Sequence, residues 1–157
     1  MSDLYRKNVG IVVANTENKV LVCNRADCDK PSWQFPQGGI EEGESVVTAA
    51  RRELYEETGL TNVEIVKIAD KPLRYDFPDD ILARFKKLGR TNIGQEQYWV
   101  LVRFSGNDKE INFNTKPDEI EFKAYEWVDI EEAVNRIVAF KKDVYKQVAK
   151  MFKPFLL

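Results

Sequence analysis

The chain has 157 residues, of which 43% are hydrophobic, 11% aromatic and 32% charged, a composition typical of one globular domain rather than a disordered segment. Its formal net charge of −2 argues against a protein that coats duplex nucleic acid through bulk charge, although it leaves open the recognition of a small anionic group. The first residues lack the features of a signal peptide, and no run approaches the length of a membrane span. We therefore expect a single cytoplasmic domain over residues 1–157, with no membrane partner.

Cysteine and histidine usage restricts the chemistry. Cys23 and Cys28 form neither a metal-binding quartet nor a disulfide framework, so we expect both to be reduced and structural. The chain has no histidine, which excludes Ser-His and Cys-His catalysis and removes the commonest general base. Any catalysis must therefore use carboxylates, lysines, tyrosines or a hard metal ion.

Alternating residue patterns predict several strands. Residues 8–14 and 19–25 are β-branched runs separated by the polar turn "NTEN", which indicates a hairpin. Residues 32–39, "SWQFPQGG", predict a short aromatic strand that is ended by Pro36 and two glycines. Further strands are predicted at residues 62–69, 97–105 and 122–129.

Helices are predicted between these strands. In residues 45–58, Val46, Ala50 and Leu54 recur on one face, and Gly59 supplies a C-terminal stop. Residues 129–137 predict a helix in which Asp129 and Glu132 fit a capping box, and a last helix is predicted at residues 141–152. Residues 71–94, with two prolines and mixed charge, indicate a long functional loop with a helical turn. The alternation favours an α+β fold, a mixed sheet covered by helices on both faces.

The end of the helix at residues 45–58 crowds like charges together. Glu53, Glu56 and Glu57 are separated by three and four residues, so their side chains share one face, where each like-charge pair costs roughly 0.2–0.5 kcal/mol. The helix dipole is negative in this last turn and favours a cation by about 0.3–1 kcal/mol. A divalent cation would turn both penalties into coordination. An acidic solvated face, partly neutralised by Arg51 and Arg52, is the alternative.

The sequence around these glutamates, "GGIEEGESVVTAARRELYEETGL", resembles the signature of the Nudix hydrolase family. Gly38 is followed after five residues by Glu44, and seven residues later come "REL", one residue, "EE", one residue and "GL". Every fixed position of the signature matches. The resemblance implies an α/β/α sandwich with a mixed sheet that uses Mg²⁺ or Mn²⁺ to hydrolyse a nucleoside diphosphate linked to another group.

The resemblance also implies roles for the matched residues. Glu53, Glu56 and Glu57 correspond to metal ligands, and one of them also receives the proton of the attacking water. Arg52 orients a glutamate, and Glu44 is a supporting carboxylate that anchors the loop or assists the metal site. Three glycines are expected to serve backbone conformation rather than contact: Gly38, Gly39 and Gly59.

A narrower resemblance, carried by "WQFPQGG", "LRYDFP" and "VAFKKD", covers nearly the whole chain. It is to the bacterial RNA pyrophosphohydrolases within this family and to the related dinucleoside polyphosphate hydrolases. It implies that Glu121 completes the metal cluster and that Arg6 and Arg25 lie near the phosphate chain. Four further residues are implied to contact substrate: Tyr75, Val138, Phe140 and Lys141. Surface charge, an exposed strand position and core packing are the structural alternatives for these residues.

Two departures from these relatives concern charge and loop length. Where relatives commonly carry a lysine, this chain has Tyr98, and acidic Glu96 precedes it, which reduces the positive charge expected near the phosphates. The loop "RADCDKPSW" is about two residues longer than in close relatives, so contacts near Arg25 could be displaced.

The sequence thus favours removal of pyrophosphate from the 5′-triphosphate end of RNA, leaving a monophosphate and promoting RNA decay. Hydrolysis of dinucleoside polyphosphates, such as diadenosine tetraphosphate, is the first alternative, because both substrates pair a base with a polyphosphate. An inactive Nudix-like module that binds nucleotide or protein is a remote one, since no glutamate of the signature is lost.

Overall fold

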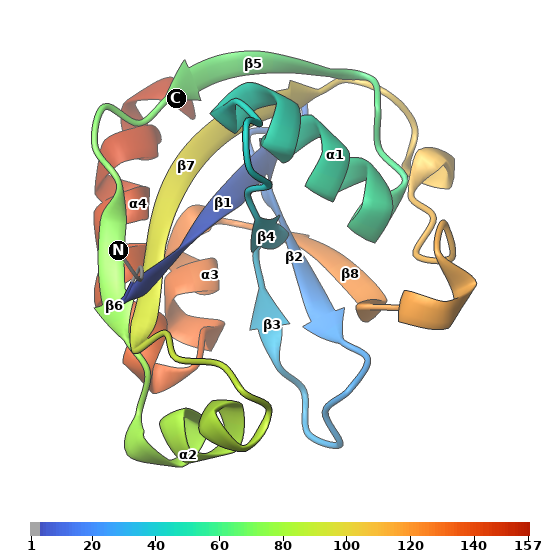
Figure 1. Ribbon diagram of the computed structural model, residues 1–157. Helices are drawn as coiled ribbons and strands as arrows, with labels where there is room; N and C mark the ends of the chain where they lie inside the picture. Colours follow the sequence, from blue (N-terminus) through green and yellow to red (C-terminus); the bar gives the residue numbers. More distant parts are fainter. Residues whose placement is uncertain (1–3) are drawn as a thin grey trace.

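One mixed sheet of eight strands organises the protein, whose computed structural model describes residues 4–157 (Figure 1). The strands are β1 (Tyr5–Ala14), β2 (Val20–Arg25), β3 (Trp33–Gln34), β4 (Gln37–Gly39), β5 (Val63–Ile68), β6 (Leu73–Asp76), β7 (Gly94–Phe104) and β8 (Phe122–Val128). The α-helices are α1 (Val46–Thr58), α2 (Asp79–Lys87), α3 (Ile130–Arg136) and α4 (Lys142–Phe152). Short 3-10 turns lie at η1 (Asp108–Glu110), η2 (Pro117–Glu119), η3 (Ala139–Lys141) and η4 (Lys153–Phe155).

The middle of the sheet is a parallel pair of long strands. β1 runs beside β7 from the pair Tyr5 and Gly94 to the pair Ala14 and Arg103. β2 returns antiparallel to β1 after the turn, where the Asn15 side chain accepts hydrogen bonds from the N–H groups of Glu17 and Lys19. The predicted hairpin is therefore confirmed, and its turn is stabilised by an asparagine that caps its own backbone.

Helices cover both faces of the sheet, which confirms the predicted α/β/α sandwich. On β1, Val9, Ile11 and Val13 point toward α1 and pack with its Ala50 and Leu54. The alternate residues of β1 belong to a second apolar core, which includes side chains of α3 and α4. This strict alternation follows from the two-residue period of a strand and gives the sheet two buried faces.

Helix α1 begins and ends where its sequence signals predict. The Ser45 hydroxyl accepts a hydrogen bond from the N–H of Thr48 at 3.1 Å, and so caps the first turn. Gly59 ends the helix with a φ of 78°, and its N–H donates to the carbonyl of Tyr55 at 2.8 Å. The helix carries the glutamates predicted to bind metal, so these two caps fix the length of the element that positions them.

Three local predictions were wrong. Residues 71–94 hold a full strand, β6, and the nine-residue helix α2 rather than a loop with one turn. Residues 32–39 form two strands, because Pro36 interrupts the ladder and β4 then pairs with β1 instead of β2. The capping box before α3 is absent, because Asp129 binds Lys19 at 2.7 Å and Glu132 binds Arg136 at 2.7 Å.

Within residues 4–157, none of the helices combines the length and the apolar character that crossing a bilayer requires.

Candidate active site

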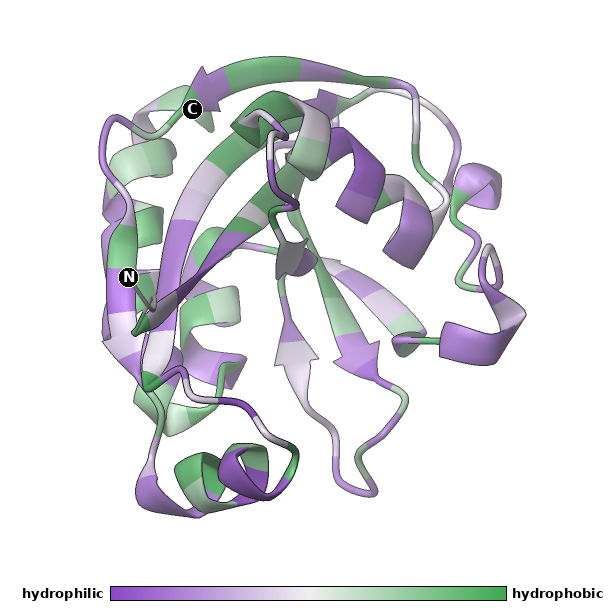
Figure 2. Cartoon of the chain, in the orientation of Figure 1, coloured by the Kyte–Doolittle hydropathy of each residue, from purple (hydrophilic) through white to green (hydrophobic). Residues whose placement is uncertain are grey.

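The last turns of α1 form a strongly hydrophilic surface on the side of the sheet where β4 ends (Figure 2). Arg52 is the centre of this surface. Its Nη1 donates to Glu53 at 2.8 Å and to Glu56 at 3.3 Å, and its Nη2 donates to the carbonyl of Gly39 at 2.9 Å. One guanidinium therefore ties two of the predicted metal ligands to the end of β4, in agreement with an orienting role for Arg52.

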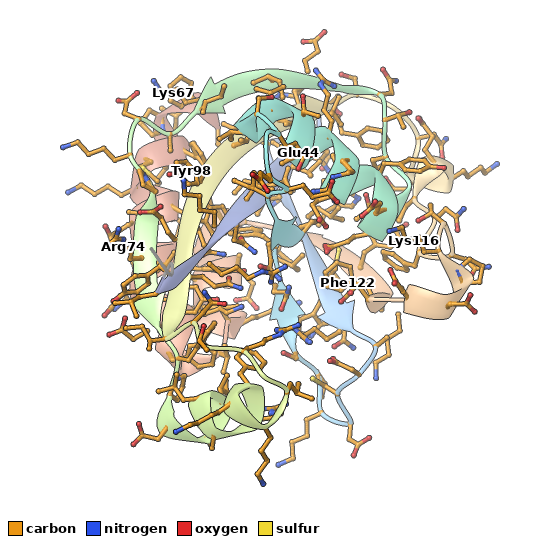
Figure 3. All side chains as sticks on the ribbon, in the orientation of Figure 1. Glu44, Lys67, Arg74, Tyr98, Lys116 and Phe122 are labelled. Carbon is orange, nitrogen blue, oxygen red and sulfur yellow. The ribbon has the colours of Figure 1, made fainter. Side chains whose placement is uncertain are left out.

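Glu44 holds the other side of the same guanidinium. Two hydrogen bonds from Arg52 and one from the N–H of Glu41 lower the pKa of Glu44 to about 2. A carboxylate with three donors is held in one place and stays ionised. Its geometry fits the anchoring role expected for Glu44, and Figure 3 places it at the start of α1.

Glu57 is the most deeply placed of the acidic residues. Its side chain is 7% exposed, and its Oε1 accepts a hydrogen bond from the N–H of Gln37 at 3.2 Å. Burial raises the pKa of Glu57 well above its usual range, and the charges of Glu53 and Glu121 add to this effect. Burial also raises the pKa of Glu53. The charge of Arg52 opposes this rise, and the charge of Glu56 adds to it. Glu57 therefore lies close enough to Glu53 and Glu121, and Glu53 close enough to Glu56, for these charges to repel one another.

These four carboxylates fit a hard divalent cation in chemistry and charge. Carboxylate oxygen is the preferred ligand of such ions, and a cation would offset both the repulsion and the burial just described. Within residues 4–157, no three acidic side chains already stand at ligating distance of a common point. Arg52 forms ion pairs with Glu53 and Glu56, and a lysine on the far side forms another with Glu56.

That lysine is Lys116, whose Nζ lies 3.1 Å from Oε1 of Glu56. It belongs to the segment between β7 and β8 and lies beside the C-terminal end of α1 (Figure 3). The neighbouring Thr115 hydroxyl donates to the carbonyl of Glu56 at 2.5 Å, and the N–H of Asn112 donates to that of Thr58 at 2.7 Å. This segment, which leads to Glu121, is thus attached to α1.

Three glycines of the signature were expected to serve backbone conformation. Of these three, Gly59 has a positive φ, whereas Gly38 and Gly39 do not. A Cβ at Gly38 would overlap the carboxylate of Glu53, and one at Gly39 would overlap the guanidinium of Arg6. Both glycines therefore leave space for charged side chains, which the sequence alone could not distinguish from a backbone requirement.

The two predicted phosphate-contacting arginines lie between the carboxylates and an aromatic cluster. Burial raises the pKa of Tyr75, and the charges of Arg6 and Arg25 oppose this rise; Arg6 also acts on Glu53, and Arg25 on Glu57. Arg6 is exposed and lies over Gly39. The two arginines therefore provide positive charge at the edge of the acidic site.

Arg25 has an additional partner in the longer loop. Its Nε and Nη2 donate to the two carboxylate oxygens of Asp27 at 2.9 and 2.6 Å, and these bonds lower the pKa of Asp27 to about 2. The longer loop was recognised from the sequence, but the pairing of Arg25 with Asp27 was not predicted. Asp27 competes with any phosphate that Arg25 would bind.

The aromatic cluster brings together three predicted substrate-contacting residues. The rings of Tyr75 and Phe140 lie 5.8 Å apart, and Nζ of Lys141 lies 5.5 Å from the centre of the Tyr75 ring. Tyr75 is buried and donates to Gln95 at 2.8 Å, so its hydroxyl is already bonded. Val138, the fourth member, is 44% exposed and precedes the turn that carries Phe140.

Two buried amides, Asn8 and Gln97, and the partly buried Gln37 support the site from below, and none of the three was predicted from the sequence. Gln97 donates to Asn8 at 3.0 Å, and Asn8 donates to the side chain of Gln37 at 2.5 Å. The backbone N–H of Gln37 in turn holds Glu57. The signal was the presence of amides at alternate positions of otherwise apolar strands, where a buried polar group requires a partner.

The acidic departure on β7 is neutralised locally. Glu96 accepts a hydrogen bond from Arg74 at 3.0 Å and another from the hydroxyl of Tyr98 at 3.2 Å. Arg74 and Tyr98 lie together at the β6 side of the sheet, away from Glu44 (Figure 3). This strand therefore adds no lysine to the phosphate site and little uncompensated negative charge.

Comparison with known proteins identifies relatives over nearly the whole chain. The family model described as "NUDIX domain" matches residues 4–148. The RNA pyrophosphohydrolase of Pelagibacter ubique (strain HTCC1062) is 45% identical over 151 residues, which are 96% of this chain and 93% of that protein. The RNA pyrophosphohydrolase of Dinoroseobacter shibae (strain DSM 16493 / NCIMB 14021 / DFL 12) is 44% identical and covers 97% of this chain and 94% of its own.

Solved structures agree in fold at low sequence identity. The Escherichia coli dihydroneopterin triphosphate pyrophosphohydrolase has a TM-score of 0.70 and 19% identity, covering 91% of this chain and 95% of its own. A Caenorhabditis elegans Ap4A hydrolase has a TM-score of 0.66 and 16% identity, covering 95% and 98%. These likenesses concern the arrangement of helices and strands.

Proposed function

Because this chain belongs to the NUDIX domain family, we propose that it removes pyrophosphate from the 5′-triphosphate end of RNA and leaves a 5′-monophosphate. The observation that carries the proposal is the identity of about 45% to curated RNA pyrophosphohydrolases over nearly the full length of both chains. A monophosphorylated end would then promote RNA decay.

The layout of the site supports this reaction. The predicted metal ligands are Glu53, Glu56, Glu57 and Glu121. Mg²⁺, or Mn²⁺ in its place, would supply charge neutralisation on the phosphates and activate water. Arg52 and Glu44 would hold the carboxylates in position, and a raised pKa suits Glu57 or Glu53 to accept a proton.

The substrate would span two regions of opposite chemistry. Arg6 and Arg25 would face the phosphate chain, and the cluster of Tyr75 and Phe140 would receive a base of the RNA. Aromatic rings hold bases of single-stranded ends by stacking, which contributes about 1–3 kcal/mol per base. Lys141, beside both rings, would contribute a charge to the same base or its phosphate.

Hydrolysis of dinucleoside polyphosphates is the second candidate. It rests on the same base and polyphosphate chemistry, and a solved Ap4A hydrolase shares the fold at 16% identity. An inactive binding module is disfavoured because every glutamate of the signature is present.

One assay separates these candidates. The purified protein with Mg²⁺ is offered triphosphorylated RNA and diadenosine tetraphosphate separately, and the products are resolved chromatographically. We expect rapid release of pyrophosphate, or of successive phosphates, from the RNA. Rapid cleavage of the dinucleotide with inert RNA would assign the second function instead, and no turnover of either would leave the binding module.

A further inference from the structure

We propose that the RNA chain behind the 5′ end runs across the basic end of α2, where Lys86 and Arg90 contact its downstream phosphates. This surface, defined by Lys86, Arg90 and the hollow between them, is called the downstream surface below. The inference rests on the proposed function and extends it from the reacting end of the RNA to the body of the chain.

The charges of α2 and the residues after it are strongly separated. Asp79 and Asp80 occupy its first turn, whereas its last turn carries three cations and is followed by another. The four cations are Arg84, Lys86, Lys87 and Arg90. All are exposed, and within residues 4–157 none of them forms an ion pair with an acidic side chain. In contrast, Arg25 and Arg52 of the catalytic site are paired with carboxylates.

Arg90 is placed by a defined turn rather than by the helix itself. Gly89 adopts a φ of 79°, which reverses the chain after α2 so that the N–H of Arg90 donates to the carbonyl of Phe85 at 3.0 Å. The Arg90 guanidinium then lies 4.9 Å from the centre of the Phe85 ring. The cation is therefore held on the protein surface without a counter-ion.

Two adjoining hollows connect this position to the catalytic site. The first, of about 400 Å³, is lined by Lys86 and Arg90 with apolar Leu82 and Ile93. The second, of about 560 Å³, has a mixed lining: the cations Arg6 and Lys7 face a loop that carries three carboxylates, those of Glu41, Glu42 and Glu44. Asn92 lines both.

The backbone fixes this connection. The N–H of Ile93 donates to the carbonyl of Leu4 at 2.7 Å, which holds the segment after α2 against the start of β1. Arg6 lies on β1 close behind that contact, and α2 lies beside the end of the sheet where β1 and β7 begin (Figure 1). The two hollows, which share Asn92, therefore lie next to each other at the same end of the molecule.

The chemistry of the downstream surface fits a single-stranded polyanion. Unpaired cations release counterions when they bind phosphates, and the apolar residues between them offer contact area for a base. A dinucleoside polyphosphate has no phosphate beyond its second nucleoside, so it cannot use the downstream surface. The substrate that gains from it is a longer RNA.

The test compares two triphosphorylated RNAs that begin with the same nucleotides, one three nucleotides long and one about 20 nucleotides long. The salt dependence of RNA binding scales with the number of phosphates that the protein contacts. The variant is K86Q/R90Q. The matched control is K146Q/K150Q, which removes two exposed, unpaired lysines from α4. A third variant, K86Q/R90K, restores one charge, and melting temperatures verify that all variants fold.

For the wild type we expect kcat/KM to be higher on the long RNA and this preference to fall roughly 7-fold between about 50 and 200 mM salt, as two contacts on single-stranded RNA predict. K86Q/R90Q should lose the preference and its salt dependence while keeping activity on the short RNA. K86Q/R90K should keep part of the preference, and K146Q/K150Q should behave as the wild type. Binding of the monophosphorylated long RNA, measured by fluorescence anisotropy, should weaken in the same order.

Two outcomes overturn the inference. Equal kcat/KM on long and short RNA in the wild type, or an unchanged preference in K86Q/R90Q, would remove the downstream surface while leaving the proposed function intact. Failure of the wild type to hydrolyse either RNA would remove both, so activity of the wild type on the short RNA distinguishes these cases.

Discussion

Arg52 binds both carboxylate oxygens of Glu44, with Nε 2.7 Å from Oε2 and Nη2 2.8 Å from Oε1. The same guanidinium reaches Glu53 and Glu56. A planar fork of donors is required for this arrangement, which a lysine could not reproduce. The acidic end of α1 is therefore positioned from one point.

Arg52→Lys should lower kcat by about 10–100-fold, the usual cost of losing a group that orients a metal ligand. The charge is kept in this variant, so the loss measures orientation. Steady-state kinetics with triphosphorylated RNA would detect it. Arg51→Lys is the matched control, because Arg51 donates only to the carbonyl of Val63 among the hydrogen bonds resolved. Equal activity of the two variants would contradict the positioning role.

Glu57→Gln should reduce turnover by at least about 100-fold while the fold remains intact. The amide can still accept the hydrogen bond from Gln37, but it carries no charge for a cation and accepts no proton. In the presence of a chelator the melting temperature of the variant should exceed that of the wild type, because a buried charge that faces Glu53 and Glu121 is removed. Glu64→Gln, on exposed β5, should change neither quantity. Near-normal turnover of Glu57→Gln would refute its assignment as a ligand.

Two glycines in the same loop should respond in opposite ways to alanine. Gly38→Ala should reduce activity more than about 10-fold with little change in stability, because the new methyl group displaces the Glu53 carboxylate from an otherwise ordinary strand conformation. Gly43→Ala should keep kcat and lower the free energy of unfolding by about 1–2 kcal/mol, since Gly43 has a φ of 79° and open space around it. Kinetics and thermal unfolding measure both. Loss of stability with normal kcat in Gly38→Ala would reverse the interpretation.

Lys141 should make substrate binding sensitive to alkaline pH. Burial, with the positive charge of Arg25, lowers the pKa of Lys141 to about 8. The ammonium group is present below this pH and is lost as the pH rises through it, so the KM for RNA should increase several-fold between about pH 7 and 9. Lys141→Arg, which stays protonated, should flatten this profile. A pH-independent KM in the wild type would contradict the substrate contact.

Whereas substrate binding should weaken as the pH rises, the contribution of Lys141 to the free energy of unfolding should increase at alkaline pH. The folded protein binds the Lys141 proton less tightly than the unfolded chain, whose lysine has a pKa near 10.5. The unfolded state therefore holds more protons between about pH 8 and 10.5, and the contribution of this group to the free energy of unfolding rises with pH there. Denaturant titrations of the wild type and of Lys141→Arg measure the difference.

The elements that could be predicted carry their own local signals. Helix α1 has an apolar period, a serine cap and a glycine stop, so residues 45–58 were sufficient to place it. Residues 71–94 conceal β6 because it pairs with β7, a distant strand, and its apolar side chains pack against α4 and η3 rather than follow an obvious alternation. The sequence around Asp129 also matched a capping box, but the Asp129 carboxylate instead accepts a hydrogen bond from a lysine of the β1–β2 turn. Tertiary partners decided both cases.

In the site, too, some residues could be predicted from local sequence and others depend on the tertiary fold. The spacing of Glu53, Glu56 and Glu57 needs only a helix to bring them together. Lys116 and Asp27 act from irregular segments whose position depends on the whole fold, and no periodicity marks them. The space left by Gly38 could be recognised only once Glu53 was seen against it.

The parallel pairing of β1 with β7 determines how late the site can form while the chain is being synthesised. Asn8 and Gln97, which support Glu57 through Gln37, are 89 residues apart in the chain. The entropy cost of closing such a long loop arises before the stabilising contacts between the strands can form. Parallel pairing is intrinsically slow for this reason. A ribosome-bound chain therefore carries all the glutamates of α1 well before it can hold Glu57 in place, so catalysis begins only after β7 has emerged and docked.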